Sequence, residues 1–309
     1  MVDSTSFKGR DIISMQDFDR SELEFILERA TEMQPLVEKG SDMLRGRILA
    51  TLFFEPSTRT RLSFEAAMLR LGGGVIGFAE PKVSSVAKGE TLSDTVKVVE
   101  NYADVLVIRH PDEDAARIAA EAASVPVMNA GSGSWEHPTQ ALLDLHTIRA
   151  AKGSIDGLTI ALVGDLLYGR TVHSLMYALS NYDVKLYLVS PEQLRMRKDV
   201  LKGVGGKVDY VETDDLKSIL PELDILYATR VQKERFSDPA DYERVKDSYK
   251  IDKSFLRSAT NSLVVMHPLP RVTEIAADVD DTEHAWYFRQ VRHGIYVRMA
   301  LLALVLGAL

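Results

Sequence analysis

Four consecutive side chains, Ser57-Thr58-Arg59-Thr60, have the chemistry of a phosphate-binding segment. Their hydroxyl groups can donate at short range, and the guanidinium of Arg59 can donate to two oxygens of one phosphate. The alternative is an ordinary helix cap beside a solvated arginine, because Ser and Thr are common caps. Four donors in succession are more specific than a lone glycine fingerprint, so we predict a phosphate site.

The local sequence places these donors at the junction of a strand and a helix. The apolar run Ile48–Phe54 predicts a buried strand of a parallel sheet. Downstream, Leu62, Ala66 and Leu69 recur at helical spacing until Gly72-Gly73-Gly74. Free N–H groups and the positive end of the helix dipole then face whatever binds at residues 57–60. An anion suits such a turn.

Apolar runs and helical patterns alternate along the chain, which predicts parallel sheets with helices on both faces. We expect an α/β fold with two open, doubly wound parallel-sheet domains joined by interdomain helices. The first would span residues 1–138, with a C-terminal helix at 293–309 packing back on it, and the second residues 139–292. The expected strands are Ile48–Phe54, Val75–Phe78, Val105–Arg109, Val125–Met128, Thr159–Val163, Lys185–Val189, Val208–Val211, Ile225–Ala228 and Leu263–Met266. The expected helices include Arg20–Val37, Thr91–Tyr102, Glu113–Ala122, Thr139–Ala151 and Thr171–Ser180.

Composition excludes several classes of protein. The chain has 309 residues, a net charge of −8, a pI near 5.5 and no cysteine. The acidic balance argues against a nucleic-acid partner. Without cysteine there are no disulfides, thiolate nucleophiles or Cys-ligated metals, and a cytoplasmic location is the simplest fit. Residues 1–10 lack the apolar core of a signal peptide, and the apolar segment 299–309 is too short to span a membrane, so we expect no membrane partner.

Polar side chains follow many of the predicted strands. In open parallel sheets, ligands bind outside the carboxyl ends of the strands. A single charged residue there is more often surface than site, but repetition at several strand ends favours one shared cleft. Besides the phosphate-binding segment, these residues are Arg109, His137, Gln140, Arg170, Arg230, Gln232, His267 and Arg271.

One of these segments imitates a nucleotide-binding motif. Gly164 to Thr171 reads G-x-x-x-x-G-R-T, close to the P-loop of nucleotide hydrolases. However, Arg170 stands where the P-loop lysine reaches the phosphates, and no later strand ends in an Asp for the metal. A P-loop nucleotide-binding protein is therefore the less favoured alternative.

Several motifs, taken together, carry a family resemblance. They are F-x-P-S-T-R-T-R at Phe54–Arg61, H-P-T-Q at His137–Gln140, G-D-x-x-x-G-R-T at Gly164–Thr171 and H-P-L-P at His267–Pro270, with shorter matches at Lys88–Thr91, Arg109–Pro111 and Thr229–Gln232. From about Lys8 to its end, the chain resembles the aspartate/ornithine carbamoyltransferase family. The ornithine branch usually has His-Cys-Leu-Pro, whereas this chain has H-P-L-P and no cysteine, which points to aspartate as the acceptor.

The resemblance implies that carbamoyl phosphate and L-aspartate give N-carbamoyl-L-aspartate and phosphate, the committed step of de novo pyrimidine biosynthesis. It implies no metal and no organic cofactor. On this basis Ser57, Thr58, Arg59 and Thr60 bind the phosphate. Thr60, Arg109 and His137 donate to the carbonyl oxygen, and Gln140 holds the amino group of carbamoyl phosphate.

For aspartate, the resemblance implies that Arg170 and Arg230 bind the two carboxylates, with Gln232 nearby. The backbone carbonyls of Pro268 and Leu269 would orient the amines. No side chain is an obvious base for the aspartate amine, so the departing phosphate is the expected proton acceptor. The implied catalytic set is Arg59, Thr60, Lys88, Arg109 and His137.

Ser84 and Lys88 lie in a polar loop that, on sequence alone, is equally well a mobile surface loop. In the family, the matching residues enter the site of a neighbouring subunit, where they contact carbamoyl phosphate and aspartate respectively. The resemblance therefore implies a homotrimer whose active sites are shared between adjacent chains. It leaves open a separate regulatory chain as a further partner.

One position departs from the family pattern. Leu167 stands where the family often has a lysine, so a positive charge near the aspartate side is missing. The strength of aspartate binding is the property this affects. The alternatives within this interpretation are a carbamoyltransferase for another amino-acid acceptor and a non-catalytic paralogue, which the intact set of polar residues argues against.

Overall fold

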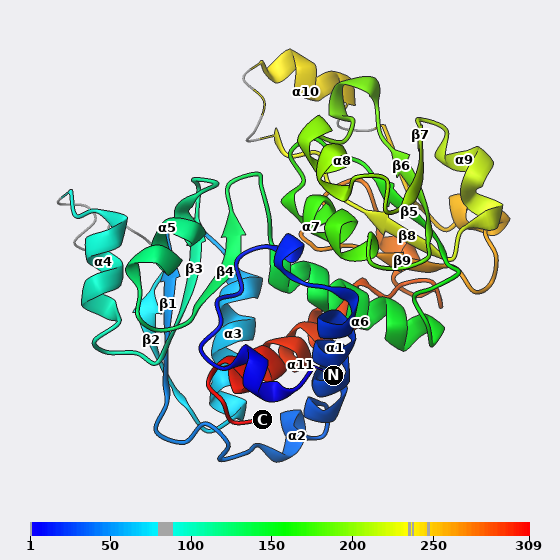
Figure 1. The fold of residues 1–309 in the computed structure, drawn as a ribbon. Helices are drawn as coiled ribbons and strands as arrows, with labels where there is room; N and C mark the ends of the chain where they lie inside the picture. Colours follow the sequence, from blue (N-terminus) through cyan, green and yellow to red (C-terminus); the bar gives the residue numbers. More distant parts are fainter. Residues whose placement is uncertain (1, 80–88, 234–235, 237, 246–247) are drawn as a thin grey trace. The chain divides into compact units, whose positions relative to one another are not determined.

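A computed structural model of the chain describes residues 2–79, 89–233, 236, 238–245 and 248–309. The chain divides into two compact units (Figure 1). The first comprises Met1–His146 and Arg292–Leu309, and the second comprises Thr147–Val291. Two helices, α6 (Pro138–Lys152) and α11 (Tyr287–Val305), contain the points at which the chain passes from one unit to the other.

The first unit is built on a parallel sheet with the strand order β2-β1-β3-β4. The chain pairs β2 on one side of β1 and then places β3 and β4 on the other, so the order reverses between β1 and β3. In open sheets this reversal creates a crevice at the carboxyl ends of the strands, which is where ligands bind. The strands are β1 (Ile48–Phe53), β2 (Gly74–Phe78), β3 (Val105–His110) and β4 (Val127–Ser132).

Helices cover both faces of this sheet. On one face, Ala50 of β1 packs with Val96 of α4 and Ala116 of α5 in a buried apolar cluster. Side chains alternate along a strand, so the buried Leu49 and Phe53 point to the other face, on the side of α3 (Figure 1). The helices are α1 (Arg20–Met33), α2 (Leu36–Lys39), α3 (Thr58–Arg70), α4 (Leu92–Val99) and α5 (Ala115–Ala122).

The second unit follows the same plan with a parallel sheet of order β7-β6-β5-β8-β9, in which the reversal lies between β5 and β8. Ala161 of β5, Leu226 of β8 and Val265 of β9 share one buried cluster with Leu216 of α9. The strands are β5 (Thr159–Val163), β6 (Lys185–Val189), β7 (Asp209–Thr213), β8 (Ile225–Ala228) and β9 (Val264–Met266). The helices are α7 (Arg170–Leu179), α8 (Lys198–Val204), α9 (Leu216–Ile219) and α10 (Pro239–Val245).

The predicted fold class is confirmed, since both sheets are parallel and both alternate with helices. The strands Thr159–Val163, Lys185–Val189 and Ile225–Ala228 have the bounds that the apolar runs predict. Among the described residues, no helix is long and apolar enough to cross a membrane.

The predicted first helix, Arg20–Val37, is wrong at its end. The structure breaks it into α1 and the short α2, with Pro35 between them. Proline has no N–H for the helical hydrogen bond, so α1 ends at Met33, although the backbone of Gln34 is still helical. Its start at Arg20 follows from Asp19, which accepts the N–H of Glu22 in a reciprocal capping arrangement.

The predicted strand Val125–Met128 is also shifted. The observed strand β4 begins after Pro126 and continues to Ser132, past the predicted end at Met128. Its pairing with β3 passes through an irregularity between Ile108 and His110, and Gly131 in the same stretch has φ = 120°. An extra residue of this kind lets a strand continue while its register shifts. Apolar periodicity does not detect a Gly- and Ser-rich strand end.

Gly164 fixes how closely the ends of β5 and β8 approach each other. It has φ = 116°, and a Cβ on it would lie 2.3 Å from the carbonyl oxygen of Thr229. Backbone atoms cannot move aside cheaply, and this φ is strained for any other residue. We expect Gly164→Ala to lower the free energy of unfolding by about 2–5 kcal/mol, measured by denaturant titration.

Gly157→Ala is the matched control. Gly157 also has a positive φ, 81°, but no atom lies within 4 Å of a Cβ built on it among the described residues. In this variant the free energy of unfolding should fall by about 1–2 kcal/mol, the cost of a positive φ at a non-glycine residue. Equal losses for the two variants would contradict the claim that close backbone approach requires Gly164.

Candidate active site

The start of α3 presents the predicted phosphate-binding residues at the carboxyl end of β1. Ser57 caps α3 with extended backbone, and its side chain makes no hydrogen bond to this fully described helix. Thr58 and Arg59 are exposed, whereas Thr60 is buried, with 7% of its surface accessible. The hydroxyl of Ser57 is thus not used by the helix, and the N-terminal N–H groups of α3 lie beside it.

Three donors predicted to act on one carbonyl oxygen come from neighbouring elements of the first unit. Thr60 Oγ1 lies 3.3 Å from Nε2 of the buried His137, which directly precedes α6. Arg109 is the penultimate residue of β3 and pairs in register with Phe53 of β1. Its Nη1 donates to the carbonyl of Ala130 at 3.4 Å. Thr60 follows β1 and Arg109 lies near the end of β3, the two strands between which the order reverses.

Glu55 adds a carboxylate to this group. Its Oε2 lies 3.4 Å from Nε of Arg109, and both side chains are largely buried. The pair holds the guanidinium near the carboxyl end of β3. A guanidinium has five N–H donors, so one carboxylate partner does not prevent it from donating to a ligand as well. Sequence analysis did not select Glu55, although it stands inside the motif that carries Ser57 and Thr60.

A second residue missed by sequence analysis positions His137. The neighbouring Glu136 is fully buried, and its carboxylate accepts the hydroxyl of Ser14 and, at 2.8 Å, the N–H of Met15. The N-terminal segment is thereby tied to the loop that ends in His137. No local signal reveals this contact, because the partners lie more than 120 residues apart.

In the second unit, the loop after β5 folds around the carboxylate of Asp165. This fully buried side chain accepts the N–H groups of Tyr168 at 2.9 Å and Gln232 at 3.2 Å, and that of Leu167 as well. Burial raises the pKa of Asp165 to about 6, although these hydrogen bonds and the charge of Arg230 act in the opposite direction. One carboxylate therefore joins the loops that follow β5 and β8.

The residues predicted to bind aspartate stand on these two loops. Arg170 is the first residue of α7, and Arg230 and Gln232 follow β8; all three are partly exposed. The side chain of Gln232 donates to the carbonyl of Tyr168 at 2.9 Å. Arg170 and Arg230 thus lie on either side of the reversal between β5 and β8. Leu167, at the position where the family often has lysine, is half-buried in the same loop.

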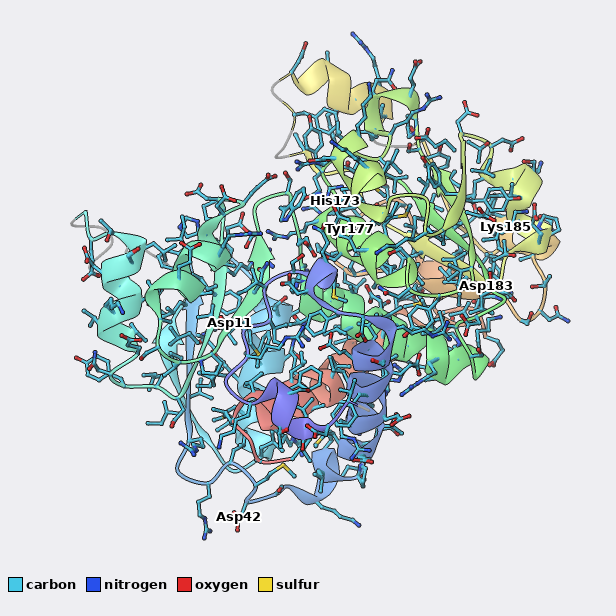
Figure 2. All side chains as sticks on the ribbon, in the orientation of Figure 1. Asp11, Asp42, His173, Tyr177, Asp183 and Lys185 are labelled. Carbon is cyan, nitrogen blue, oxygen red and sulfur yellow. The ribbon has the colours of Figure 1, made fainter. Side chains whose placement is uncertain are left out.

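α7 anchors the loop from its other end. The ring of His173 hydrogen-bonds through Nε2 to the carbonyl of Leu166 at 2.8 Å, so this nitrogen carries the proton. His173 and the buried Tyr177, one turn further along, both project from α7 (Figure 2). This anchoring places Arg170 at the helix N-terminus.

The same geometry argues against a P-loop. In a P-loop, the backbone N–H groups cradle phosphates. Here those of Leu167 and Tyr168 point to Asp165, and a Cβ on Gly169 would lie 2.3 Å from the carbonyl of Asp165. The loop is closed around its own carboxylate rather than open to a nucleotide.

The turn after β9 carries Pro268 and Leu269, whose carbonyls are predicted to orient the amines. His267 is buried; its Nδ1 accepts the N–H of Leu269 at 2.8 Å, and its Nε2 lies 2.8 Å from Glu274 Oε1. Leu269 has φ = 57°, a conformation that costs a non-glycine residue about 1–2 kcal/mol. The His267–Glu274 pair holds this strained turn in place.

Glu274 is suited to hold this turn because its pKa is lowered, which keeps its side chain a carboxylate. Burial acts to raise its pKa, but the hydrogen bond and charge of His267, with backbone N–H groups, hold the pKa below its usual range. The nearby Arg271, which also follows β9, is paired within the chain. Its guanidinium binds Asp280, with Nη2 2.6 Å from Oδ2, and lies over the ring of Tyr287.

Two predicted site residues, Ser84 and Lys88, lie outside the described residues. Gln140 lies in the first turn of α6, where its N–H donates to the carbonyl of His137 at 3.0 Å. In the described ranges, no group of three or more His, Asp or Glu side chains is arranged to hold a metal ion.

Comparison with known proteins covers the whole chain. Residues 10–150 match the aspartate/ornithine carbamoyltransferase carbamoyl-P binding domain, and residues 156–305 match the Asp/Orn binding domain. The aspartate carbamoyltransferase catalytic subunit of Thermococcus kodakarensis is 61% identical over 308 residues, which is 98% of this chain and 99% of that protein.

Solved structures of aspartate transcarbamoylases have the same fold as this chain. Aspartate transcarbamoylase from Trypanosoma cruzi, in complex with carbamoyl phosphate and aspartate, aligns with a TM-score of 0.94 and 43% identity over 99% of both chains. The catalytic subunit of M. jannaschii aspartate transcarbamoylase aligns with a TM-score of 0.89 and 52% identity, covering 96% of this chain and 98% of the other.

The raised pKa of Asp165 predicts a pH-dependent stability. A carboxyl group with a folded pKa of about 6 binds its proton more tightly in the folded than in the unfolded chain. Its stabilising contribution is therefore complete below about pH 4 and is lost as the pH rises through 6. Compared with Asp165→Asn, which cannot titrate, the wild type should lose about 3 kcal/mol between pH 4 and pH 7.

Denaturant titrations of both proteins across this range measure the difference. A substitution that merely disturbs the loop shifts stability by a similar amount at every pH. A difference that does not change with pH would contradict the assignment of the raised pKa to this buried carboxylate.

Proposed function

The chain belongs to the aspartate/ornithine carbamoyltransferase family, and we infer that it transfers the carbamoyl group of carbamoyl phosphate to L-aspartate. The products are N-carbamoyl-L-aspartate and phosphate, the reaction that commits carbon to pyrimidine synthesis. The observation that carries this function is the approach of Thr60 to His137, with Arg109 near the carboxyl end of β3, the strand that pairs with β1.

Carbamoyl phosphate suits this group. Its phosphate is a dianion, and the start of α3 offers backbone N–H groups together with Ser57, Thr58 and Arg59. Its carbonyl oxygen gains negative charge as the amine attacks, and Thr60, Arg109 and His137 would donate to it. Donors that are fixed before the reaction are usually the largest catalytic contribution in acyl transfer. Glu55 and Glu136 hold two of these donors in advance.

Aspartate binding is assigned to the second unit. Two guanidinium groups, from Arg170 and Arg230, match the two carboxylates of a dicarboxylic amino acid. Ornithine would bring an ammonium group to the same arginines, which disfavours it as the acceptor. Pro268 and Leu269 would accept hydrogen bonds from the attacking amine through their carbonyls. The departing phosphate would take the amine proton, so no side chain is assigned as general base.

We also propose a homotrimer in which Ser84 and Lys88 of one chain complete the site of the next. The support is the family resemblance of the segment that contains them. The curated relatives are named catalytic subunits, which is consistent with a separate regulatory chain as a further partner. The cytoplasmic location expected from the cysteine-free sequence stays a prediction.

Arg59 provides the test of the assigned chemistry. The purified chain should carbamoylate L-aspartate and not L-ornithine when given carbamoyl phosphate. Arg59→Ala should lower kcat by two to three orders of magnitude, because one fixed donor to developing charge is worth about 3–4 kcal/mol. Its melting temperature should stay near that of the wild type, since Arg59 is exposed.

Arg45→Ala is the control, because Arg45 is an exposed arginine of the same unit, with 78% of its side chain accessible. Its turnover should equal that of the wild type. Near-normal turnover in Arg59→Ala would refute the phosphate assignment, and transfer to ornithine instead of aspartate would refute the choice of acceptor.

Sharing of sites between chains predicts complementation. Arg59→Ala and Lys88→Ala proteins should each be nearly inactive. When they are unfolded together in equal amounts and reassembled, roughly a quarter of the sites in random trimers pair an intact Arg59 with an intact Lys88. The mixture should recover about that fraction of wild-type activity.

If Lys88 acts within its own chain, no mixed assembly contains an intact site. Activity would then stay at the background of the two parent proteins. Each parent, unfolded and reassembled alone, controls for losses during refolding.

A further inference from the structure

A buried ionic network lies directly beneath Gln140. Arg298 of α11 is completely enclosed, and its Nη1 donates to Ser63 Oγ at 2.8 Å. Its Nη2 lies 3.5 Å from Thr139 Oγ1, and its guanidinium stacks over the ring of Phe64 at 4.9 Å. One side chain of the C-terminal helix therefore contacts both α3 and α6, the helices whose first turns carry the phosphate- and carbamoyl-binding residues.

The charge of Arg298 requires a counter-charge. Burial lowers the pKa of this guanidinium to about 10, while the neighbouring Asp144 acts to raise it. At neutral pH the group is still a cation, and a cation without water is tolerated only beside an anion. Asp144 is fully buried on α6 and supplies that anion as a carboxylate.

Asp144 also determines which way the amide of Gln140 points. Gln140 Nε2 donates to Asp144 Oδ1 at 2.9 Å. A carboxylate can only accept hydrogen bonds, so the NH2 end of the amide must face Asp144 and the oxygen must face away. Within the described part of the chain, this is the one hydrogen bond recorded for the Gln140 side chain.

We propose that Asp144, held by Arg298, is a positioning residue that makes the enzyme select carbamoyl phosphate by turning the oxygen of Gln140 toward the substrate. This inference rests on the proposed function, in which Gln140 meets the amino group of carbamoyl phosphate. A carbonyl oxygen there accepts an N–H from that amino group. An amide turned the other way would set NH2 against NH2 and would reject the correct substrate.

Acetyl phosphate is the probe that isolates this step. It has the same phosphate and carbonyl as carbamoyl phosphate, but a methyl group in place of the amino group, so it cannot donate to Gln140. The measured quantity is the ratio of kcat/KM for carbamoyl phosphate to kcat/KM for acetyl phosphate, with L-aspartate as the acceptor. If acetyl phosphate is not turned over, its inhibition constant against carbamoyl phosphate replaces its kcat/KM.

Asp144→Asn should lower this ratio at least about tenfold, the effect of one hydrogen bond between substrate and site. Arg298 would attract the oxygen of the new amide, which leaves its NH2 facing Gln140 and reverses the Gln140 amide. Because this variant leaves a buried cation without a full counter-charge, it is paired with Asp144→Asn/Arg298→Gln, which removes both charges. In the double variant no cation orients the new amide, which can then offer either its oxygen or its NH2 to Gln140, so the ratio should fall between those of the wild type and Asp144→Asn.

Ser63→Ala is the matched control. It removes a hydrogen bond to Arg298 but leaves the contact between Asp144 and Gln140 intact, so the ratio should equal that of the wild type even if both rates fall. If the folded Asp144 variants lower both substrates equally, the network only supports the fold and the proposal is overturned. Failure of the proposed function itself is separate, because wild type would then not carbamoylate aspartate.

Discussion

Buried carboxylates that accept hydrogen bonds from the surrounding chain hold the loops on which the substrate-facing groups stand. Asp165, Glu136 and Glu274 each lie near the carboxyl end of a sheet and collect N–H or O–H donors. Glu136 and Asp165 draw donors from segments distant in sequence, whereas the donors to Glu274 lie within its own turn. An anion out of water is costly unless donors satisfy it, so these segments must converge on it. Because the donors include backbone N–H groups, the loops are fixed as backbone and not only through their side chains.

This arrangement separates two uses of positive charge. Arg298 is buried with the carboxylate of Asp144 as its neighbouring charge, and Arg271 is bound to the carboxylate of Asp280. Arg59 is exposed at the start of a helix, and Arg170 is partly exposed at the start of another. Residue type and position after a strand do not distinguish these cases, since Arg271 also follows a strand. A carboxylate partner does not settle the matter either, because Arg109 is paired with Glu55 and is still assigned to the substrate carbonyl.

The features predicted from the sequence are those encoded locally. An apolar run followed by Ser57-Thr58-Arg59-Thr60 contains both the strand and the turn, so β1 and the start of α3 lie close to the predicted positions. The contacts that fix the site are not local: Glu136 meets Met15, and Arg298 meets Ser63, across more than 100 residues. Apolar periodicity also failed to predict the end of β4, because its last residues include glycine and serine and belong to the strand through their pairing with β3.

The two sheets explain how one family can serve two acceptors. Each sheet reverses its strand order at one point. The side chains at each reversal stand on loops, whose sequences can change without altering the strands. Residues 10–150, most of the first unit, match the carbamoyl-P binding domain of the aspartate/ornithine family, and in the proposed function Glu55 and Glu136 hold its donors in place. In the proposed function, acceptor choice falls to the loops after β5, β8 and β9, where Arg170 and Arg230 would meet the acceptor's charge. A change of acceptor therefore requires new side chains on those loops, while the donors for the carbonyl and phosphate stay as they are.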